Sequence, residues 1–216
     1  TRAIFEQASK DLSQKKPGEP DSQAILKVKA LIRRGEAKSA CHYLGIDQNN
    51  VHFLEMPFYE TGGIKKNPLS EQDIDIICNL LEEIKPHQVF AAGDLSDPHG
   101  THRICYTAIL KAMEKLRQRP WIKDCRLWLY RGAWQEWDVA DVDMAVPLSP
   151  EEVIIKRNAI FRHQSQKDPA MFPGNDPREF WRRAEERNTA VLYDKLGMAE
   201  YQAIEMFRLQ REGMKI

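Results

Sequence analysis

A short apolar run that opens into a polar loop with two histidines is the feature that most constrains the fold of this chain. Gly93 ends the run Val89–Ala92, the next loop carries two aspartates and two histidines, and a helical pattern begins after it. This succession of strand, loop and helix is typical of an open α/β sheet, where ligands gather at the carboxyl ends of the strands. The sequence therefore indicates an α/β protein with this loop beside its working surface.

The same alternation of short strands and capped helices continues along the chain. Apolar residues at helical spacing mark the helices, together with the N-cap Ser70 and the capping box of Ser149 and Glu152. Helices are expected at 3–12, 22–44, 70–85, about 102–119, from 150 onward and from about 176 to 193, and strands at 51–56, 89–92, 126–130, 141–146 and 201–209. Strands that alternate with helices predict a three-layer, Rossmann-like α/β fold with a mainly parallel sheet.

Composition excludes several classes of partner. The 216 residues hold 32 lysines and arginines against 32 aspartates and glutamates, so no net charge attracts nucleic acid or an anionic membrane. No apolar run approaches the roughly 18 residues that cross a bilayer. The four cysteines lack C-x-x-C spacing and stand in apolar surroundings, which is typical of reduced thiols in a cytoplasmic protein.

The two loop histidines suggest a reaction class. His99 and His102 are three residues apart, so they share a face if both lie in the first helical turn. A neutral imidazole binds zinc, and a second one nearby serves as acid, base or electrophile. Asp94 and Asp97 lie in the same loop, and one of them could support the first histidine, His99. Exposed loop or helix-capping histidines show the same spacing, and that interpretation stays open.

Three separated blocks carry a resemblance to one enzyme family. The first runs from Arg33 and Glu36 to Leu44-Gly45, the second from Pro86 to His102, and the third from Lys156 to Gln166. They are similar to an R-x-x-E helix ending in A-x-x-L-G, to a strand followed by H-x-x-H, and to a K-x-x-A-x-x-x-H-x-S-Q helix. In this order, over residues 22 to about 190, they resemble the PIG-L/LmbE superfamily of GlcNAc-phosphatidylinositol de-N-acetylases.

The resemblance implies a zinc-dependent hydrolysis and also reveals a gap. By the family pattern, His102 is a zinc ligand and His99 is the catalytic residue that faces the substrate carbonyl. The family's opening H-P-D-D segment, which supplies two further ligands and the catalytic aspartate, does not occur in this sequence. We therefore expect an N-terminally truncated LmbE-like domain over 22–216, preceded by a linker or extension over 1–21. Zinc is expected in the complete domain, and in this fragment it is expected to be absent or weakly bound.

Other residues of the three blocks are candidates for substrate or supporting contacts. Arg33 and Glu36 either brace the wall of the active site or form an ordinary surface pair. Arg103 either contacts substrate hydroxyls or phosphate or is a solvated helix residue, and His163 is either a supporting donor or a packed helix-end histidine.

Two functions follow from these observations. The chain is expected to be part of a zinc-dependent N-acetyl amino-sugar deacetylase, inactive by itself, with an amino sugar as substrate. The alternative is a non-catalytic C-terminal module of a protein similar to glucosamine- or galactosamine-6-phosphate isomerases (deaminases), because bacterial fusions of such a domain with an LmbE-like domain resemble this chain. The expected partners are then the missing N-terminal segment, the fused isomerase-like domain, or a second copy joined through the open edge of the sheet.

Overall fold

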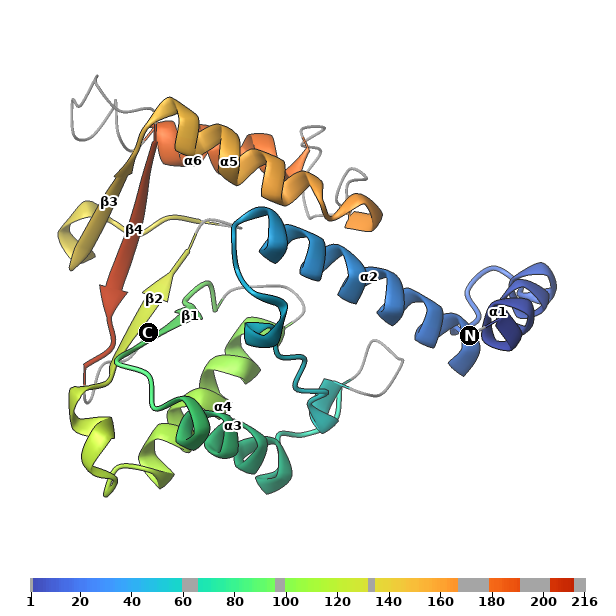
Figure 1. Cartoon of the computed structure of the whole chain (residues 1–216), viewed down its shortest axis with the longest axis horizontal. Coiled ribbons are helices and arrows are strands. Elements are labelled where there is room, and N and C mark those ends of the chain that lie inside the picture. Colours follow the sequence, from blue (N-terminus) through green and yellow to red (C-terminus); the bar gives the residue numbers. More distant parts are fainter. Residues whose placement is uncertain are drawn as a thin grey trace. The chain divides into compact units, whose positions relative to one another are not determined.

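The computed structural model describes residues 2–59, 66–95, 100–131, 135–166, 179–190 and 203–211. The chain divides into two compact units (Figure 1). Unit 1 comprises residues 1–68 and 158–168, and unit 2 comprises residues 69–157 and 169–216. Each unit is described by itself.

Unit 1 is built around two packed helices, α1 (Arg2–Gln14) and α2 (Gln23–Tyr43). Ala8 of α1 and Ile25 of α2 are both buried. α2 begins where the sequence predicted, and Ser22 caps it, since its hydroxyl accepts the backbone N–H of Ile25 at 3.4 Å. Gly45, at φ 78°, provides the left-handed turn that ends the helix. Short 3-10 turns η1 (Gln48–Asn50), η2 (Pro57–Tyr59) and η5 (Gln164–Gln166) complete the described part of unit 1.

The strand predicted at 51–56 is wrong. This segment joins η1 to η2 without pairing with a strand. Glu55 has φ 49°, a left-handed conformation that breaks an extended backbone, and Pro57 follows directly. Side-chain contacts with α2 hold the segment instead, since Arg34 pairs with Glu55 at 2.5 Å and its guanidinium lies 5.6 Å from the centre of the Phe53 ring.

Unit 2 contains a four-stranded sheet in the order β1-β2-β4-β3. Its strands are β1 (Gln88–Ala92), β2 (Arg126–Tyr130), β3 (Met144–Leu148) and β4 (Ala203–Leu209). β1 and β2 are parallel, with Ala91 opposite Leu129, whereas β4 runs antiparallel to both β2 and β3. The α/β class is confirmed, but this sheet is mixed rather than mainly parallel. Alternating apolar residues mark β4 as a strand and do not encode its direction.

Two helices begin in unit 2 at the capping residues that the sequence indicated. α3 (Glu71–Ile84) starts with a capping box, in which the Ser70 N–H donates to Asp73 at 2.9 Å and the Asp73 N–H donates to Ser70 at 3.4 Å. The box of Ser149 and Glu152 starts α5 (Pro150–Phe161) in the same way. The remaining helical elements are α4 (Thr101–Lys115), α6 (Phe180–Ala190), η3 (Pro120–Asp124) and η4 (Val139–Asp141).

Two predicted boundaries are shifted in the structure. The helix predicted to reach 119 ends at Lys115, and the strand predicted from 141 starts at Met144 because η4 occupies the preceding residues. The ends predicted for the helix at 176–193 lie outside the described residues, and its centre is α6.

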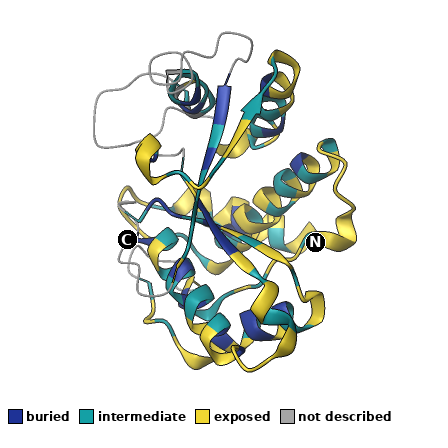
Figure 2. Cartoon of the chain, turned by 90° about the vertical axis from the view of Figure 1, so that its left-hand side faces the viewer, coloured by how far each residue is buried: buried dark blue, intermediate teal, exposed yellow. Residues whose placement is uncertain are grey.

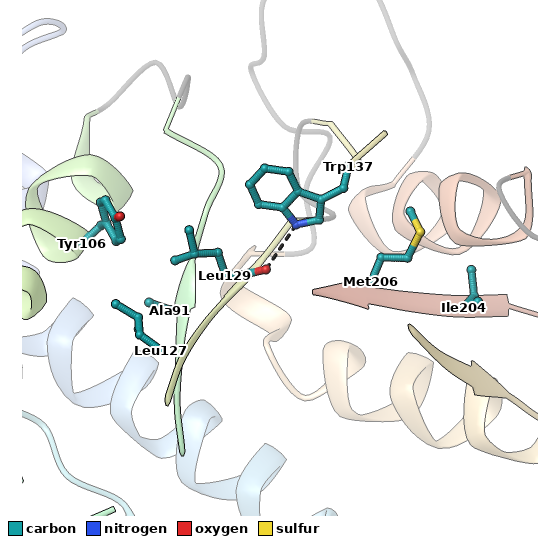
Figure 3. Packing of buried hydrophobic residues seen from close by; sticks show 7 residues of the cluster. All are labelled: Ala91, Tyr106, Leu127, Leu129, Trp137, Ile204 and Met206. Carbon is teal, nitrogen blue, oxygen red and sulfur yellow. Dashed lines mark hydrogen bonds between the residues drawn. The ribbon is translucent and has the colours of Figure 1, made fainter. Parts of the chain in front are cut away.

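The core of unit 2 lies where α4 and the loop after β2 cover one face of the sheet (Figure 3). Leu129 is 0% and Trp137 2% exposed, and the Trp137 indole N–H donates to the Leu129 carbonyl at 3.2 Å. Figure 2 shows this concentration of buried residues on β2 and β4. Burial of each large apolar side chain contributes about 1.5–3 kcal/mol. Among the described residues, no helix is both long and apolar enough to cross a membrane.

Candidate functional site

Five residues gather where β1 and β2 end, and we call them the strand-end cluster. Because the two strands are parallel, their carboxyl ends meet at the same edge of the sheet. Gly93 and Asp94 directly follow β1, Arg131 directly follows β2, His102 lies in the first turn of α4, and Trp137 covers the strand ends from the loop after β2. The fold alone brings the backbones of these five residues to the same edge of the sheet.

The imidazole of His102 is oriented by the backbone of Asp94. Its Nδ1 lies 3.3 Å from the Asp94 carbonyl oxygen. A carbonyl oxygen only accepts, so this hydrogen bond requires the proton on Nδ1. The tautomer leaves the Nε2 lone pair available, and metal-binding histidines use the same second hydrogen bond to fix their orientation. The structure thus places this predicted residue in a form that can bind a cation or accept a proton.

Asp94 supports the loop through both backbone and side chain. Its side chain is 1% exposed, and its carboxylate accepts a hydrogen bond from Gln135 Nε2 at 3.4 Å. Its backbone carbonyl, not its carboxylate, is what meets His102. Asp94 is therefore a buried positioning residue between the two strand ends.

Arg131 is a member of the cluster that sequence reasoning missed. Its Nε donates to the Gly93 carbonyl at 3.2 Å, and its guanidinium lies 3.6 Å from the centre of the Trp137 ring. Burial lowers the pKa of Arg131 by more than the nearby Asp94 and Glu136 raise it, and Arg208 lowers it further. Arg131 directly follows a predicted strand, and this position was the sequence signal by which it could have been identified.

Gly93 is required by this packing. A Cβ at this position would lie 2.8 Å from the Trp137 ring and 2.9 Å from the Leu129 Cβ. The Gly93 N–H also donates to the Tyr130 carbonyl at 2.7 Å, which extends the parallel pairing past the end of β1. The close approach lets the indole ring lie against the strand end, and any side chain would displace it.

Two predicted loop residues, Asp97 and His99, lie outside the described residues. The described part of the chain holds no group of three or more His, Cys, Asp or Glu side chains able to enclose a metal ion. Catalytic zinc takes about three protein ligands. The described residues therefore do not by themselves form a zinc site, and His102 is the residue among them whose geometry suits one ligand position.

Arg103 lies in the first turn of α4, next to His102. Its side chain is exposed, and its Nη2 would lie 3.3 Å from a Cβ built on Gly100, the residue that precedes α4 at φ 65°. Its side chain therefore lies close to the first turn of α4.

Three more predicted residues, Arg33, Glu36 and His163, lie in unit 1, and together with Ser165 we call them the Glu36 cluster. Glu36 accepts the backbone N–H of Ser165 at 2.7 Å and its hydroxyl at 2.6 Å. Burial alone would raise the pKa of Glu36, but the two Ser165 hydrogen bonds and the charges of His163 and Arg33 together lower it. The first and third sequence blocks are thus joined by one ionised carboxylate.

A cavity of about 390 Å³ opens beside this cluster within unit 1. Asn158 lines it and donates to the Tyr43 hydroxyl at 3.0 Å, and the Arg162 guanidinium lies 4.7 Å from the centre of the Tyr43 ring. Its lining is largely polar, and consists of Ser39, Asn158, Phe161, Arg162 and Gln164.

A polar network also crosses the interior of unit 2. Asn188 of α6 is 1% exposed, donates to Glu136 Oε2 at 3.3 Å and accepts Lys156 Nζ at 2.9 Å. Lys156 also pairs with Glu205 of β4. Burial raises the pKa of Glu136, although the backbone N–H of Trp137 lowers it. The network ties α5 and α6 to the sheet next to the strand-end cluster.

Residues 7–113 match the PIG-L family, described as GlcNAc-PI de-N-acetylase. Over this span the chain is similar to the PIG-L family. The span includes Arg33 and Glu36 in unit 1 and Asp94 and His102 in unit 2. The family assignment made from the sequence blocks is therefore confirmed.

One relative of this chain is a glucosamine-6-phosphate deaminase-like protein of Bacteroides thetaiotaomicron. The two are 56% identical over 207 residues. The match covers 94% of this chain but 31% of that protein, so the chain spans about a third of its relative's length.

Solved structures share the fold at low sequence identity. The N,N'-diacetylchitobiose deacetylase of Pyrococcus horikoshii is 18% identical with a TM-score of 0.52, covering 84% of this chain and 64% of that chain. GalB, the 4-carboxy-2-hydroxymuconate hydratase of Pseudomonas putida KT2440, is 14% identical with a TM-score of 0.57, covering 99% of this chain and 83% of that chain. A deacetylase and a hydratase thus share this fold, so the chemistry of this chain must be argued from its own residues.

Proposed function

We propose that this chain is part of a longer protein that removes the acetyl group from an N-acetylated amino sugar, with the strand-end cluster in its active site. The PIG-L match over residues 7–113 and the deacetylase fold support the reaction class. The deaminase-like name of the Bacteroides thetaiotaomicron relative supports an amino sugar as the substrate class.

The orientation of His102 is the observation that carries this proposal. With Nδ1 donating to the Asp94 carbonyl, Nε2 presents its lone pair to whatever lies at the sheet edge. A histidine that merely capped a helix or faced solvent would not need a fixed tautomer. His99, three residues earlier, is proposed as the donor to the oxyanion that develops on the acetamide carbonyl.

Zinc is proposed as the metal of the complete domain. It would supply an activated water for attack on the amide. Because the described residues offer His102 and no full ligand set, the other ligands and the catalytic base must come from residues outside those described. For this chain we propose that His102 is a zinc ligand and that the backbone carbonyl of Asp94 orients it. Arg33, Glu36, Arg103 and His163 are proposed to contact the substrate or to form the wall of its binding site.

Acetate release by the full-length protein tests the proposal. N-acetylglucosamine and its phosphate would be offered to the unmodified protein and to His102→Ala and His99→Ala. We expect His102→Ala to lose activity and bound zinc together, and His99→Ala to keep zinc but turn over roughly a hundred- to a thousandfold more slowly. The matched control is His87→Ala, which removes an exposed histidine at the opposite end of β1. Undiminished acetate release from both loop variants would refute the proposal.

A non-catalytic role is the second candidate. The deaminase-like relative is about three times as long as the matched segment, which favours a module that packs against a sugar-phosphate isomerase domain. In that case His102→Ala would leave every activity of the full-length protein intact, while deletion of the segment would change the stability or kinetics of the isomerase domain.

A further inference from the structure

We propose that Arg131 binds an anionic group of the substrate, a phosphate or a carboxylate, at the edge where β1 and β2 end. The proposal rests on the proposed function for the rest of the substrate, the N-acetylated sugar. It adds a determinant of specificity at the same site, supplied by a residue outside the three sequence blocks that carry the family resemblance.

The guanidinium of Arg131 is held in a fixed orientation. Its Nε donates to the Gly93 carbonyl at 3.2 Å, and its plane packs 3.6 Å from the centre of the Trp137 ring. Trp137 is itself immobilised, since it is 2% exposed and its indole N–H donates to Leu129 at 3.2 Å. A side chain ordered in advance loses little conformational entropy when it binds a ligand.

The binding end of this guanidinium remains available. Within the described part of the chain, the two terminal NH₂ groups of Arg131 make no hydrogen bond, and the side chain is partly exposed. Paired NH₂ groups of an arginine match the geometry of carboxylate and phosphate oxygens, which accept two parallel hydrogen bonds. A buried arginine that served only to pin the loop would be expected to use these donors within the protein.

Local charge also favours an anion here. Arg208 lies beside the same indole ring, 5.5 Å from its centre, and its own partner is Asp141 at 3.5 Å. Asp94 and Glu136 attract the Arg131 charge, whereas burial and the charge of Arg208 lower the pKa of Arg131. An incoming anion would add a favourable interaction to this partly desolvated guanidinium.

The position agrees with a role in substrate binding. Arg131 and His102 contact consecutive carbonyl groups, those of Gly93 and Asp94. A substrate whose reacting group lies at His102 is therefore also close to Arg131, at the same edge of the sheet.

Binding by the full-length protein, measured by isothermal titration calorimetry, tests this inference. The probes are N-acetylglucosamine, its 6-phosphate and N-acetylmuramic acid, so that a neutral, a phosphorylated and a carboxylated sugar are compared. We expect one charged sugar to bind roughly ten- to a hundredfold more tightly than the neutral sugar, and the tighter of the two identifies the anion. Arg131→Gln should remove this preference by weakening the charged sugar more than the neutral one, and Arg131→Lys should lose most of the preference because a lysine lacks the paired NH₂ groups.

The control is Arg117→Gln, which removes an exposed arginine of unit 2 that pairs with Glu114. It should retain the full preference for the charged sugar. Equal binding of charged and neutral sugars by the unmodified protein, or a preference that survives Arg131→Gln, would overturn the inference. If Arg131→Gln weakens all three sugars equally, the residue is structural and the inference also fails.

Acetate release separates this inference from the proposed function. If acetate is released from neutral and charged sugars at the same rate and with the same KM, deacetylation stands and the role of Arg131 falls. If no sugar is deacetylated but binding of the charged sugar still depends on Arg131, the anion site stands and the proposed reaction falls.

Discussion

The carboxylate of Glu36 accepts two hydrogen bonds from Ser165, which lies 129 residues further along the chain. Glu36 belongs to α2 and Ser165 to η5, so one side-chain contact closes unit 1 between the N-terminal helices and the segment that follows α5.

Ser165→Ala should destabilise unit 1 in a pH-dependent way. The variant keeps the backbone N–H bond to Glu36 but loses the hydroxyl bond, at a cost of about 0.5–1.5 kcal/mol in the free energy of unfolding at neutral pH. The folded state lowers the pKa of Glu36, so its stabilisation is present above the unfolded pKa and disappears as pH falls through the folded pKa. Urea unfolding at several pH values should show the loss near neutrality and little difference in acid.

Ser39→Ala is the control for this measurement. Ser39 is an exposed residue of the same helix and makes no described hydrogen bond, so its removal should change stability by less than about 0.5 kcal/mol. If Ser165→Ala changed the free energy of unfolding as little as Ser39→Ala does, the hydrogen bond from the Ser165 hydroxyl to Glu36 would contribute nothing to stability.

Gly93→Ala should destabilise unit 2 because the new methyl group has no room. It would meet the Trp137 ring at 2.8 Å and the Leu129 Cβ at 2.9 Å, and overpacking of this kind costs about 1–3 kcal/mol. Gly35→Ala, in the middle of α2 with open space around it, should instead stabilise the helix by about 0.5–1 kcal/mol. Thermal unfolding of the two variants should therefore shift in opposite directions, and a tolerated Gly93→Ala would contradict the packing described here.

Helix starts were predictable because capping is local. Ser22, Ser70 and Ser149 each satisfy a backbone N–H within three residues, and all three helices begin as the sequence predicted. The direction of β4 depends on its pairing with strands that are distant in the sequence. The absence of a strand at 51–56 depends on the left-handed backbone of Glu55. The alternation of apolar and polar residues encodes neither feature.

The candidate site was predictable in part for the same reason. His102 and Asp94 follow a strand that is recognisable in the sequence, and this position identified them as candidates. Arg131 joins the site because β2 lies parallel to β1 and brings it to Gly93, and only the fold shows this pairing. The contact of Glu36 with Ser165 likewise joins residues whose proximity no local pattern encodes. Asp97 and His99 stay predictions.

Glu136→Gln should flatten the pH dependence of stability. Burial raises the pKa of Glu136 in the folded state, so the folded protein keeps this proton to a higher pH than the unfolded chain does. The stabilisation from the neutral carboxyl is present below the unfolded pKa and is lost as pH rises through the folded pKa. Urea unfolding between pH 4 and pH 8 should show the unmodified protein losing stability relative to Glu136→Gln as pH rises. Glu114→Gln, at an exposed residue of α4, should keep the original profile, and parallel profiles for all three proteins would contradict this prediction.

Zinc content distinguishes this chain from the full-length protein. One imidazole does not hold zinc against dialysis, because firm sites use about three protein ligands, and His102 is the described residue whose geometry suits one. Inductively coupled plasma mass spectrometry on the dialysed 216-residue chain should find well under one zinc per chain, whereas the full-length protein should hold about one per domain. In the full-length protein, His102→Ala should lose this zinc and His87→Ala should retain it. Stoichiometric zinc in the isolated chain would mean that residues outside those described complete the site, and the proposal that further ligands come from the longer protein would then be wrong.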